Sequence, residues 1–200
     1  MVENIITKQL ADELMKIKGE VRGIAPKAHV QFAVEEKGES VFEKVENKMA
    51  ELGHSVDYKS LRPMSFYPVG IEAVTLLVIK ELFDYDDKKL KEIGEYQSKV
   101  SLIIKLFMKY FVSINTIAEK APEMWRKYYT IGNLKVTELN EKEKYTVIEI
   151  KDFKIHEFHC QMLKGYFANV VKMVVKENTT CNEVKCCFKG HDSHEFLIKW

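Results

Sequence analysis

The sequence predicts an α+β domain, in which N-terminal helices pack on a roughly four-stranded antiparallel sheet made of two hairpins flanking a helix. Helical apolar spacing dominates the first two-thirds of the chain, and short strand-like segments follow Gly132. Its 200 residues, 46% hydrophobic and without a linker-like stretch, are enough for one core. We therefore expect a single domain over 1–200, with 1–17 as a helical extension.

The N-terminal part contains three segments with helical patterns and one ambiguous segment. Apolar residues at helical spacing predict a helix over 5–17, and a Ser-Val-Phe-Glu capping box predicts another over 40–52. Residues 21–35 are apolar and fit either a helix or a strand. Pro68 suits the first turn of a helix, and the strongly apolar segment 71–83 follows it.

The middle of the chain predicts the central packing helices. Residues 84–87 interrupt the apolar pattern, and 88–111 then predicts one long helix with an apolar face. A further helix over 114–129 ends in an aromatic-rich run, after which Gly132 suits a C-terminal cap. We expect the 88–111 helix to be the central packing element.

The last third combines strands with one helix. Segments 134–139 and 145–150 have strand composition and a polar turn between them, which predicts a hairpin. Helical spacing returns over 155–175, and a second hairpin over about 184–200 closes the chain. Two hairpins that flank a helix form the predicted sheet.

Charge and hydropathy exclude several classes of function. The chain has 31 basic and 30 acidic residues, a net charge of +1, and interspersed charges, so nucleic acid is an unsuitable direct partner. No apolar run reaches the roughly 18 residues of a membrane span, and the N-terminus lacks the pattern of a secretory signal. We therefore expect a cytoplasmic protein whose four cysteines are thiols or metal ligands, not disulfides.

Four residues near the C-terminus have side chains that can bind zinc: Cys160, Glu183, Cys186 and His194. Gly190 lies midway between Cys186 and His194, so a hairpin around it places these two side chains opposite each other, about 5 Å apart at Cβ. The cysteines are also compatible with small buried core residues, because free cysteine is among the most buried residue types.

The chain from about residue 18 to 200 resembles the 4-vinyl reductase domain family, whose relatives include the sensor domain of phenol-responsive transcription activators. Family members carry a cysteine near the start of a helix, a Gly-aromatic step, and a Glu-x-x-Cys-x-x-x-Gly-x-x-x-Cys-x-Phe hairpin. The matching residues here are Cys160, Gly165, Tyr166, Glu183, Cys186, Gly190, His194 and Phe196. His194 replaces the last cysteine and keeps the number of donors at four.

The resemblance implies a structural zinc site and a pocket for a small hydrophobic or aromatic ligand. Four protein ligands leave zinc no open position for catalysis, while Cys181 and Cys187 are reserve ligands outside the family pattern. Aromatic residues are candidates for the pocket wall, although they are equally compatible with an ordinary core. These candidates are Trp125, Tyr128, Tyr129, Phe158 and Tyr166.

The function expected from the resemblance is a small-molecule-binding sensor or regulatory domain. We expect a homodimer, with the 5–17 helix as a candidate face. One alternative is an uncharacterised reductase, but no Gly-x-Gly-x-x-Gly or comparable catalytic motif supports it. Another is a haem-based nitric oxide sensor, which shares the family's fold, yet no histidine lies between His54 and His156. The last is a non-catalytic scaffold of the vesicle-tethering type, which shares the fold too.

Overall fold

The computed structural model describes residues 5–200, apart from the side chain of Met108. Its helices are α1 (Lys8–Met15), α2 (Ile24–Lys37), α3 (Ser40–Glu51), α4 (Val69–Phe83), α5 (Asp87–Val100), α6 (Leu102–Phe107), α7 (Ile114–Tyr128) and α8 (Glu157–Val175), with short 3₁₀ turns η1 (Met108–Tyr110) and η2 (Cys187–Lys189). The strands are β1 (Glu20–Arg22), β2 (Phe66–Pro68), β3 (Asn133–Asn140), β4 (Tyr145–Lys151), β5 (Thr180–Lys185) and β6 (Ser193–Lys199).

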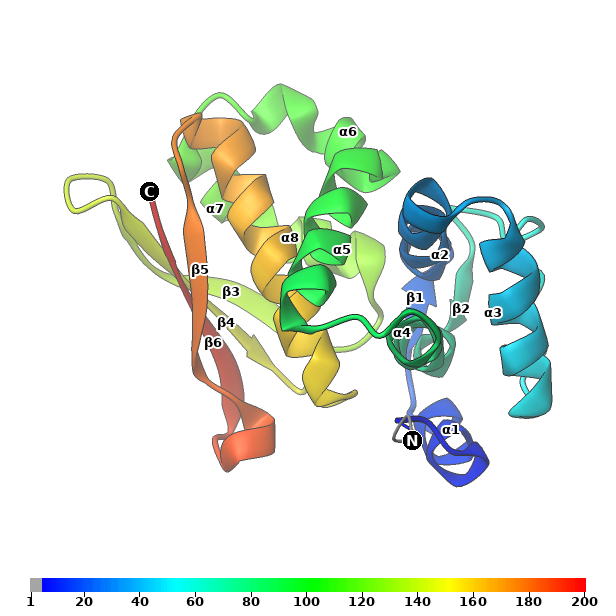
Figure 1. The fold of residues 1–200 in the computed structure, drawn as a ribbon. Coiled ribbons are helices and arrows are strands. Elements are labelled where there is room, and N and C mark those ends of the chain that lie inside the picture. The colour runs from blue at the N-terminus through cyan, green and yellow to red at the C-terminus, as the bar shows by residue number, and fades with distance from the viewer. Residues whose placement is uncertain (1–4) are drawn as a thin grey trace.

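The main sheet has the order β3-β4-β6-β5, and all its neighbouring strands are antiparallel. Helix α8 connects the first hairpin to the second, and β6 returns between β4 and β5 (Figure 1). Strand composition and turn chemistry place both hairpins close to where the sequence predicts them. The α+β class and the two hairpins flanking a helix are therefore confirmed.

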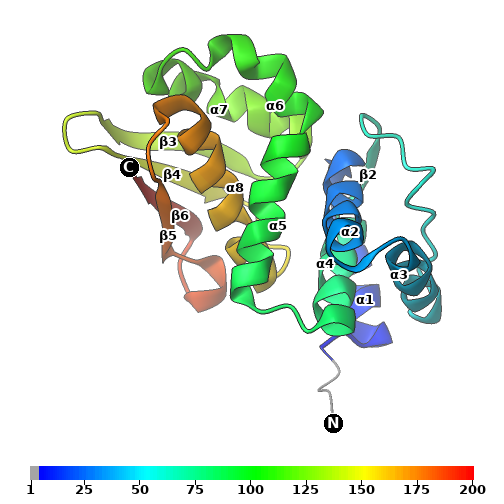
Figure 2. The ribbon, with the colours of Figure 1, turned by 45° about the horizontal axis from the view of Figure 1, so that its top comes forward.

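The helices form two successive layers beside this sheet. Helices α7 and α8 contact the sheet, α5 packs along α8, and α1 to α4 lie on the far side of α5 (Figure 2). A small two-stranded sheet pairs β1 with β2 within the N-terminal layer. One cluster of buried apolar residues extends through both layers. The N-terminal helices thus reach the sheet mainly through α5 and α8.

The single long helix expected over 88–111 is wrong, because the chain breaks at Ser101. This residue has extended backbone angles, φ −61° and ψ 121°, between α5 and α6. Its buried Oγ accepts a hydrogen bond from the backbone N–H of Ile104 at 3.0 Å, as a helix-capping serine does. The apolar period continues across the break, so periodicity alone did not reveal it.

Two smaller expectations also need correction, and one open assignment is resolved. Helix α3 begins at Ser40 as predicted, but no side chain caps it. Gly132 does not cap α7, which ends in extended backbone at Tyr129, where an isolated bridge to Val21 forms. The ambiguous segment 21–35 contains the end of β1 and most of α2.

The candidate dimer face on the N-terminal helix is covered by the chain itself. Ile6, Ala11 and Leu14 are buried, and α1 packs against α4. This helix therefore presents its charged side, and not its apolar side, to solvent. Within residues 5–200, no helix has both the length and the apolar character needed to cross a membrane.

Candidate metal centre and apolar pocket

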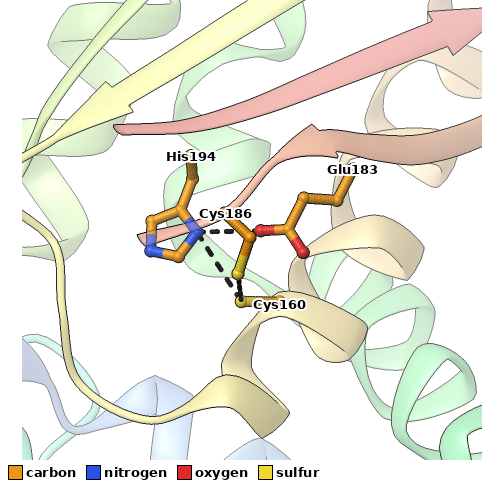
Figure 3. Close-up of side chains that lie close together, drawn as sticks. All are labelled: Cys160, Glu183, Cys186 and His194. Atoms are coloured by element: carbon orange, nitrogen blue, oxygen red, sulfur yellow. Dashed lines mark hydrogen bonds and ion pairs between the residues drawn. The ribbon is translucent and has the colours of Figure 1, made fainter. Parts of the chain in front are cut away.

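The structure brings Cys160, Glu183, Cys186 and His194 together at one end of the sheet (Figure 3). One donor atom from each residue lies within 4.8 Å of the donor atoms of the other three. Cys160 is in the first turn of α8, and the other three lie on or next to the β5–β6 hairpin. The cluster therefore joins the helix layer to the sheet.

Local hairpin geometry explains why three of the four side chains meet. Lys185 pairs with Glu195, so continuing that register by one residue places Cys186 opposite His194. Residues three apart in a regular strand point to opposite faces. The register shift between Glu183 and Lys185 adds a residue, which allows Glu183 and Cys186 to face the same side.

The hydrogen bonds of His194 leave one ring nitrogen directed at the other three donors. Its Nε2 lies 2.8 Å from the carbonyl oxygen of Phe153, which can only accept, so Nε2 carries a proton. Its Nδ1 lies 2.8 Å from Glu183 Oε1 and 3.7 Å from Cys160 Sγ. Either an imidazolium or a neutral ring that binds a cation through Nδ1 satisfies this geometry. A backbone carbonyl on the remote nitrogen is a common outer-shell partner of a metal-bound histidine.

The donor set fits zinc. The two sulfur atoms lie 3.8 Å apart, and Cys160, Cys186 and His194 are buried. Burial raises the pKa of the Cys160 thiol, and Glu183 and Cys186 raise it further. Burial also acts to raise the pKa of Glu183, but hydrogen bonds from His194, Cys160 and Cys186 outweigh it and lower that pKa. A divalent cation would stabilise the deprotonated thiols and the carboxylate together, and two sulfurs with one nitrogen and one oxygen suit zinc.

The other two cysteines lie outside this cluster. Cys181 is buried on β5 in register with Ile198, and Cys187 is in the η2 turn. Neither belongs to the group of donor atoms that lie within 4.8 Å of one another. The cluster is thus complete without the reserve ligands.

A second feature is an apolar cavity of about 60 Å³ between α7, α8 and the β3–β4 hairpin. Trp125, Tyr128, Tyr129 and Tyr166 line it, whereas Phe158 lies outside it beside the His156 ring. Much of the remaining wall consists of aliphatic side chains. These include Ile114, Ile117, Ala118 and Ala121 from α7, Leu134, Val136 and Ile148 from the strands, and Met162, Leu163, Val170 and Val171 from α8.

Internal hydrogen bonds hold the aromatic part of this wall in place. Trp125 stacks on Tyr129 with ring centroids 4.6 Å apart, and its Nε1 donates to the carbonyl oxygen of Ile131 at 3.0 Å. Tyr128 donates to Ser101. Burial raises the pKa of both tyrosines, so each stays a neutral phenol. The sequence analysis predicts only aromatic residues for the wall, although the apolar face of α7 is evident in the sequence and supplies aliphatic residues to it.

A buried polar cluster next to this cavity was not predicted at all. Tyr129 and Gln97, which both line the cavity, contact Glu72 and His29 respectively. Tyr129 donates to Glu72 Oε1 at 2.9 Å, and Gln97 Oε1 accepts from His29 Nε2 at 3.0 Å. His159 Nε2 lies 3.5 Å from Glu72 Oε2. In the sequence, the carboxylate and the two histidines are single polar residues within separate helical segments, and no motif links them.

Several atoms of this cluster lack hydrogen-bond partners among the described residues. They are His29 Nδ1, Glu72 Oε2 and both ring nitrogens of His159. All three side chains are buried, and burial lowers the pKa of His29, which therefore stays neutral near pH 7. Glu72 on α4 therefore lies close to His29 on α2, His159 on α8 and Tyr129 at the end of α7, and it links these elements.

Comparisons with known proteins identify the fold. No family model matches the chain, and no curated protein matches it. An H-NOX protein from S. oneidensis in the Fe(II)NO ligation state matches with a TM-score of 0.65 and 11% identity, over 89% of this chain and 98% of that one. An oxygen-binding H-NOX domain related to soluble guanylate cyclases matches with a TM-score of 0.56 and 13% identity, over 86% and 90%. The protein is therefore an α+β domain with the H-NOX fold.

Two further comparisons bear on the predicted relationships. A structure concerned with haem redox potential and porphyrin distortion matches with a TM-score of 0.61 and 12% identity, over 90% of this chain and 99% of that one. At these identities the likeness shows the fold alone. A trafficking protein particle complex subunit 3 from Naegleria fowleri, covalently bound to palmitic acid, reaches a TM-score of only 0.47, which is too low to establish a shared fold. The 4-vinyl reductase resemblance stays a prediction.

The residues around the cavity do not fit haem. Its described lining contains no histidine or cysteine, and the phenols of Tyr128 and Tyr129 already donate to Ser101 and Glu72. The cavity is also small, because an engineered cavity of roughly 150 Å³ accepts only a molecule of the size of benzene. This cavity is therefore not a haem site.

Proposed function

We propose that this protein is a small-molecule-binding sensor or regulatory domain that takes a small hydrophobic or aromatic ligand between α7 and α8. The observation that carries the proposal is the cavity, whose wall is almost entirely apolar and lies between two helices and a sheet. Such sites are typical for apolar ligands. The H-NOX structures with bound nitric oxide and oxygen support a sensing role for this fold.

The proposed zinc ion has a structural role. Four protein ligands leave it no open coordination position, so it would hold the start of α8 to the last hairpin. Met162 and Tyr166 line the cavity from the same helix, within two turns of Cys160. A fixed α8 gives the ligand a rigid wall on one side.

The opposite wall of the cavity, formed by α7, is the part that moves when ligand binds. A cavity of about 60 Å³ is less than half of the roughly 150 Å³ that accommodates benzene, so a drug-sized ligand must displace side chains or a helix. Helix α7 is joined to the rest of the molecule by the short elements α6 and η1 on one side and by β3 on the other. We propose that ligand binding shifts α7 relative to α8, and that this shift is the signal.

A ligand screen tests the proposal. Small phenols, other aromatic compounds and medium-chain fatty acids are added to the purified protein, and the melting temperature is measured. A binding compound raises it, and Ala118→Phe, which fills the cavity, abolishes the rise. The exposed substitution Lys172→Ala on α8 is the control and leaves the rise unchanged. A screen without any stabilising compound, or a rise that persists in Ala118→Phe, overturns the pocket.

A further inference from the structure

The segment between Glu95 and Glu119 contains no acidic residue. It carries three lysines, Lys99, Lys105 and Lys109, whereas the whole chain balances 31 basic against 30 acidic residues. All three lysines are exposed. This segment comprises the end of α5, then α6, η1 and the start of α7, and its exposed lysines have no acidic residue within the segment.

The same segment exposes apolar side chains. Leu102, Leu106 and Val112 are 37%, 62% and 79% exposed, while Ile103 and Phe107 are buried beneath them. Helix α6 is thus apolar on its outer as well as its inner side. A surface helix of a soluble protein normally has a polar outer face. The exposed apolar side chains of α6 therefore indicate an interaction site for an apolar partner.

An aromatic ring in this surface lies close to two cations. Tyr110 is half-buried, and the ammonium groups of Lys109 and Lys120 lie 5.0 Å and 5.1 Å from its ring centroid. Tyrosine and lysine are residues that anchor proteins at the boundary between hydrocarbon and lipid headgroups, because each has an apolar body and a polar end.

The surface also adjoins the proposed ligand pocket. Helix α6 and the η1 turn contact α7, whose residues Ile114 and Ile117 line the cavity. Figures 1 and 2 show α6 at the outer end of the helix layers, opposite the end where the turn of the last hairpin lies. A partner that binds α6 therefore lies next to the start of α7, the helix proposed to shift when ligand binds.

We propose that the α6 surface, defined by Leu102, Lys105, Leu106, Lys109, Tyr110 and Val112, docks on the surface of an anionic lipid bilayer. Exposed leucine and valine enter the headgroup region, and the lysines bind negatively charged headgroups. The lysines argue against a second copy of this chain, because a two-fold contact through this surface brings them close to their own copies. Docking on the bilayer is independent of the proposed ligand function. The idea that a lipid-like ligand enters beside α7 from the bilayer rests on that function.

Vesicle sedimentation tests the proposal with the full chain. The protein is mixed with phosphatidylcholine vesicles that contain or lack phosphatidylserine. We expect it to sediment with the anionic vesicles and to be released as salt is raised. Lys105→Gln with Lys109→Gln lowers the partition coefficient by about tenfold or more, and Leu106→Ser with Val112→Ser lowers it comparably. The matched control, Lys142→Gln with Val184→Ser, changes exposed residues elsewhere and keeps the binding.

Three results would overturn the proposal. They are sedimentation with neither vesicle, binding that both test pairs leave unchanged, and a dimer in solution that Leu106→Ser with Val112→Ser dissociates. The ligand-induced rise in melting temperature is measured in the same variants without vesicles. If that rise persists while vesicle binding is absent, the docking proposal is wrong and the proposed ligand function stands. If the protein binds vesicles but no compound raises the melting temperature, the docking proposal stands and the ligand function is wrong.

Discussion

Gly94 on α5 and Gly165 on α8 let the two helix backbones approach to van der Waals contact. A methyl group on Gly94 would lie 1.9 Å from the carbonyl oxygen of Met162, and one on Gly165 would lie 1.9 Å from that of Lys91. Both clashes are with backbone atoms, which cannot move aside as a flexible side chain can. This contact fixes α5 against α8, and α8 carries one wall of the pocket and the first metal ligand.

We predict that Gly165→Ala destabilises the protein. In a helix interior, replacing glycine with alanine normally stabilises a protein by about 0.5–1 kcal/mol. Here we expect the opposite effect on the free energy of unfolding. Overpacking of this kind costs about 1–3 kcal/mol, and chemical denaturation measures it. The control Lys172→Ala, on the exposed side of the same helix, changes the free energy of unfolding by less than about 0.5 kcal/mol. Equal or higher stability of Gly165→Ala would contradict the close helix contact.

We predict that Cys160→Ser loses one zinc ion per chain and melts at a lower temperature. Zinc at a thousand times its dissociation constant stabilises the folded state by about 4 kcal/mol, which corresponds to roughly 10 °C for a chain of this size. Elemental analysis of protein purified without added zinc gives the metal content. Cys187→Ser is the control, because this cysteine is close by but outside the cluster, and it keeps both metal and melting temperature. Wild-type protein without metal, together with a melting temperature that a chelator leaves unchanged, would refute the site.

Local and distant relationships differ in how well the sequence reveals them. The last hairpin is local: Gly190 marks its turn, and the spacing of Cys186 and His194 around it places both near one point. Cys160 is a possible ligand by residue type alone, but only the family resemblance predicts that it lies beside the hairpin, because its helix is separate from it. The cluster of His29, Glu72 and His159 depends on three helices meeting, and no periodicity or motif records such a meeting.

The break at Ser101 shows a second limit. A serine inside an apolar helical pattern is unremarkable, and its ability to cap α6 depends on burial that only the assembled fold provides. The α6 surface was hidden by the same pattern: Leu106 fits a buried helix face as well as it fits an exposed one. Pattern reasoning identifies apolar residues but not which of them stay in contact with solvent.

We predict that Glu72→Leu costs about 1–3 kcal/mol and that Glu72→Gln costs less. Leucine removes the acceptor for the buried phenol of Tyr129, and an unsatisfied buried donor carries a penalty of that size. Glutamine keeps one carbonyl oxygen for the same hydrogen bond. Urea denaturation of both variants measures the difference. If Glu72→Leu is as stable as wild type, the buried polar cluster does not contribute to stability and does not hold the helices together.

The last prediction concerns stability against acid at the start of α8. His156 caps this helix, with its Nδ1 accepting from the backbone N–H of Phe158 at 3.3 Å. Burial, assisted by His159, lowers the pKa of His156 to about 4, below the value of about 6.5 expected in the unfolded chain. Between about pH 6.5 and pH 4 the unfolded chain therefore binds a proton that the folded protein does not. The free energy of unfolding falls over that window as pH decreases and is unaffected by this group above it.

The variant His156→Asn isolates this effect. Asparagine keeps a side-chain oxygen for the helix cap but does not titrate, so the variant loses less stability than wild type as pH falls from 7 to 5. His29, whose pKa burial also lowers, contributes with the same sign in both proteins and cancels in the comparison. Chelator in every sample removes the pH dependence of metal binding. Parallel stability curves for the two proteins over this range would show that His156 takes up its proton equally well in the folded and unfolded chains.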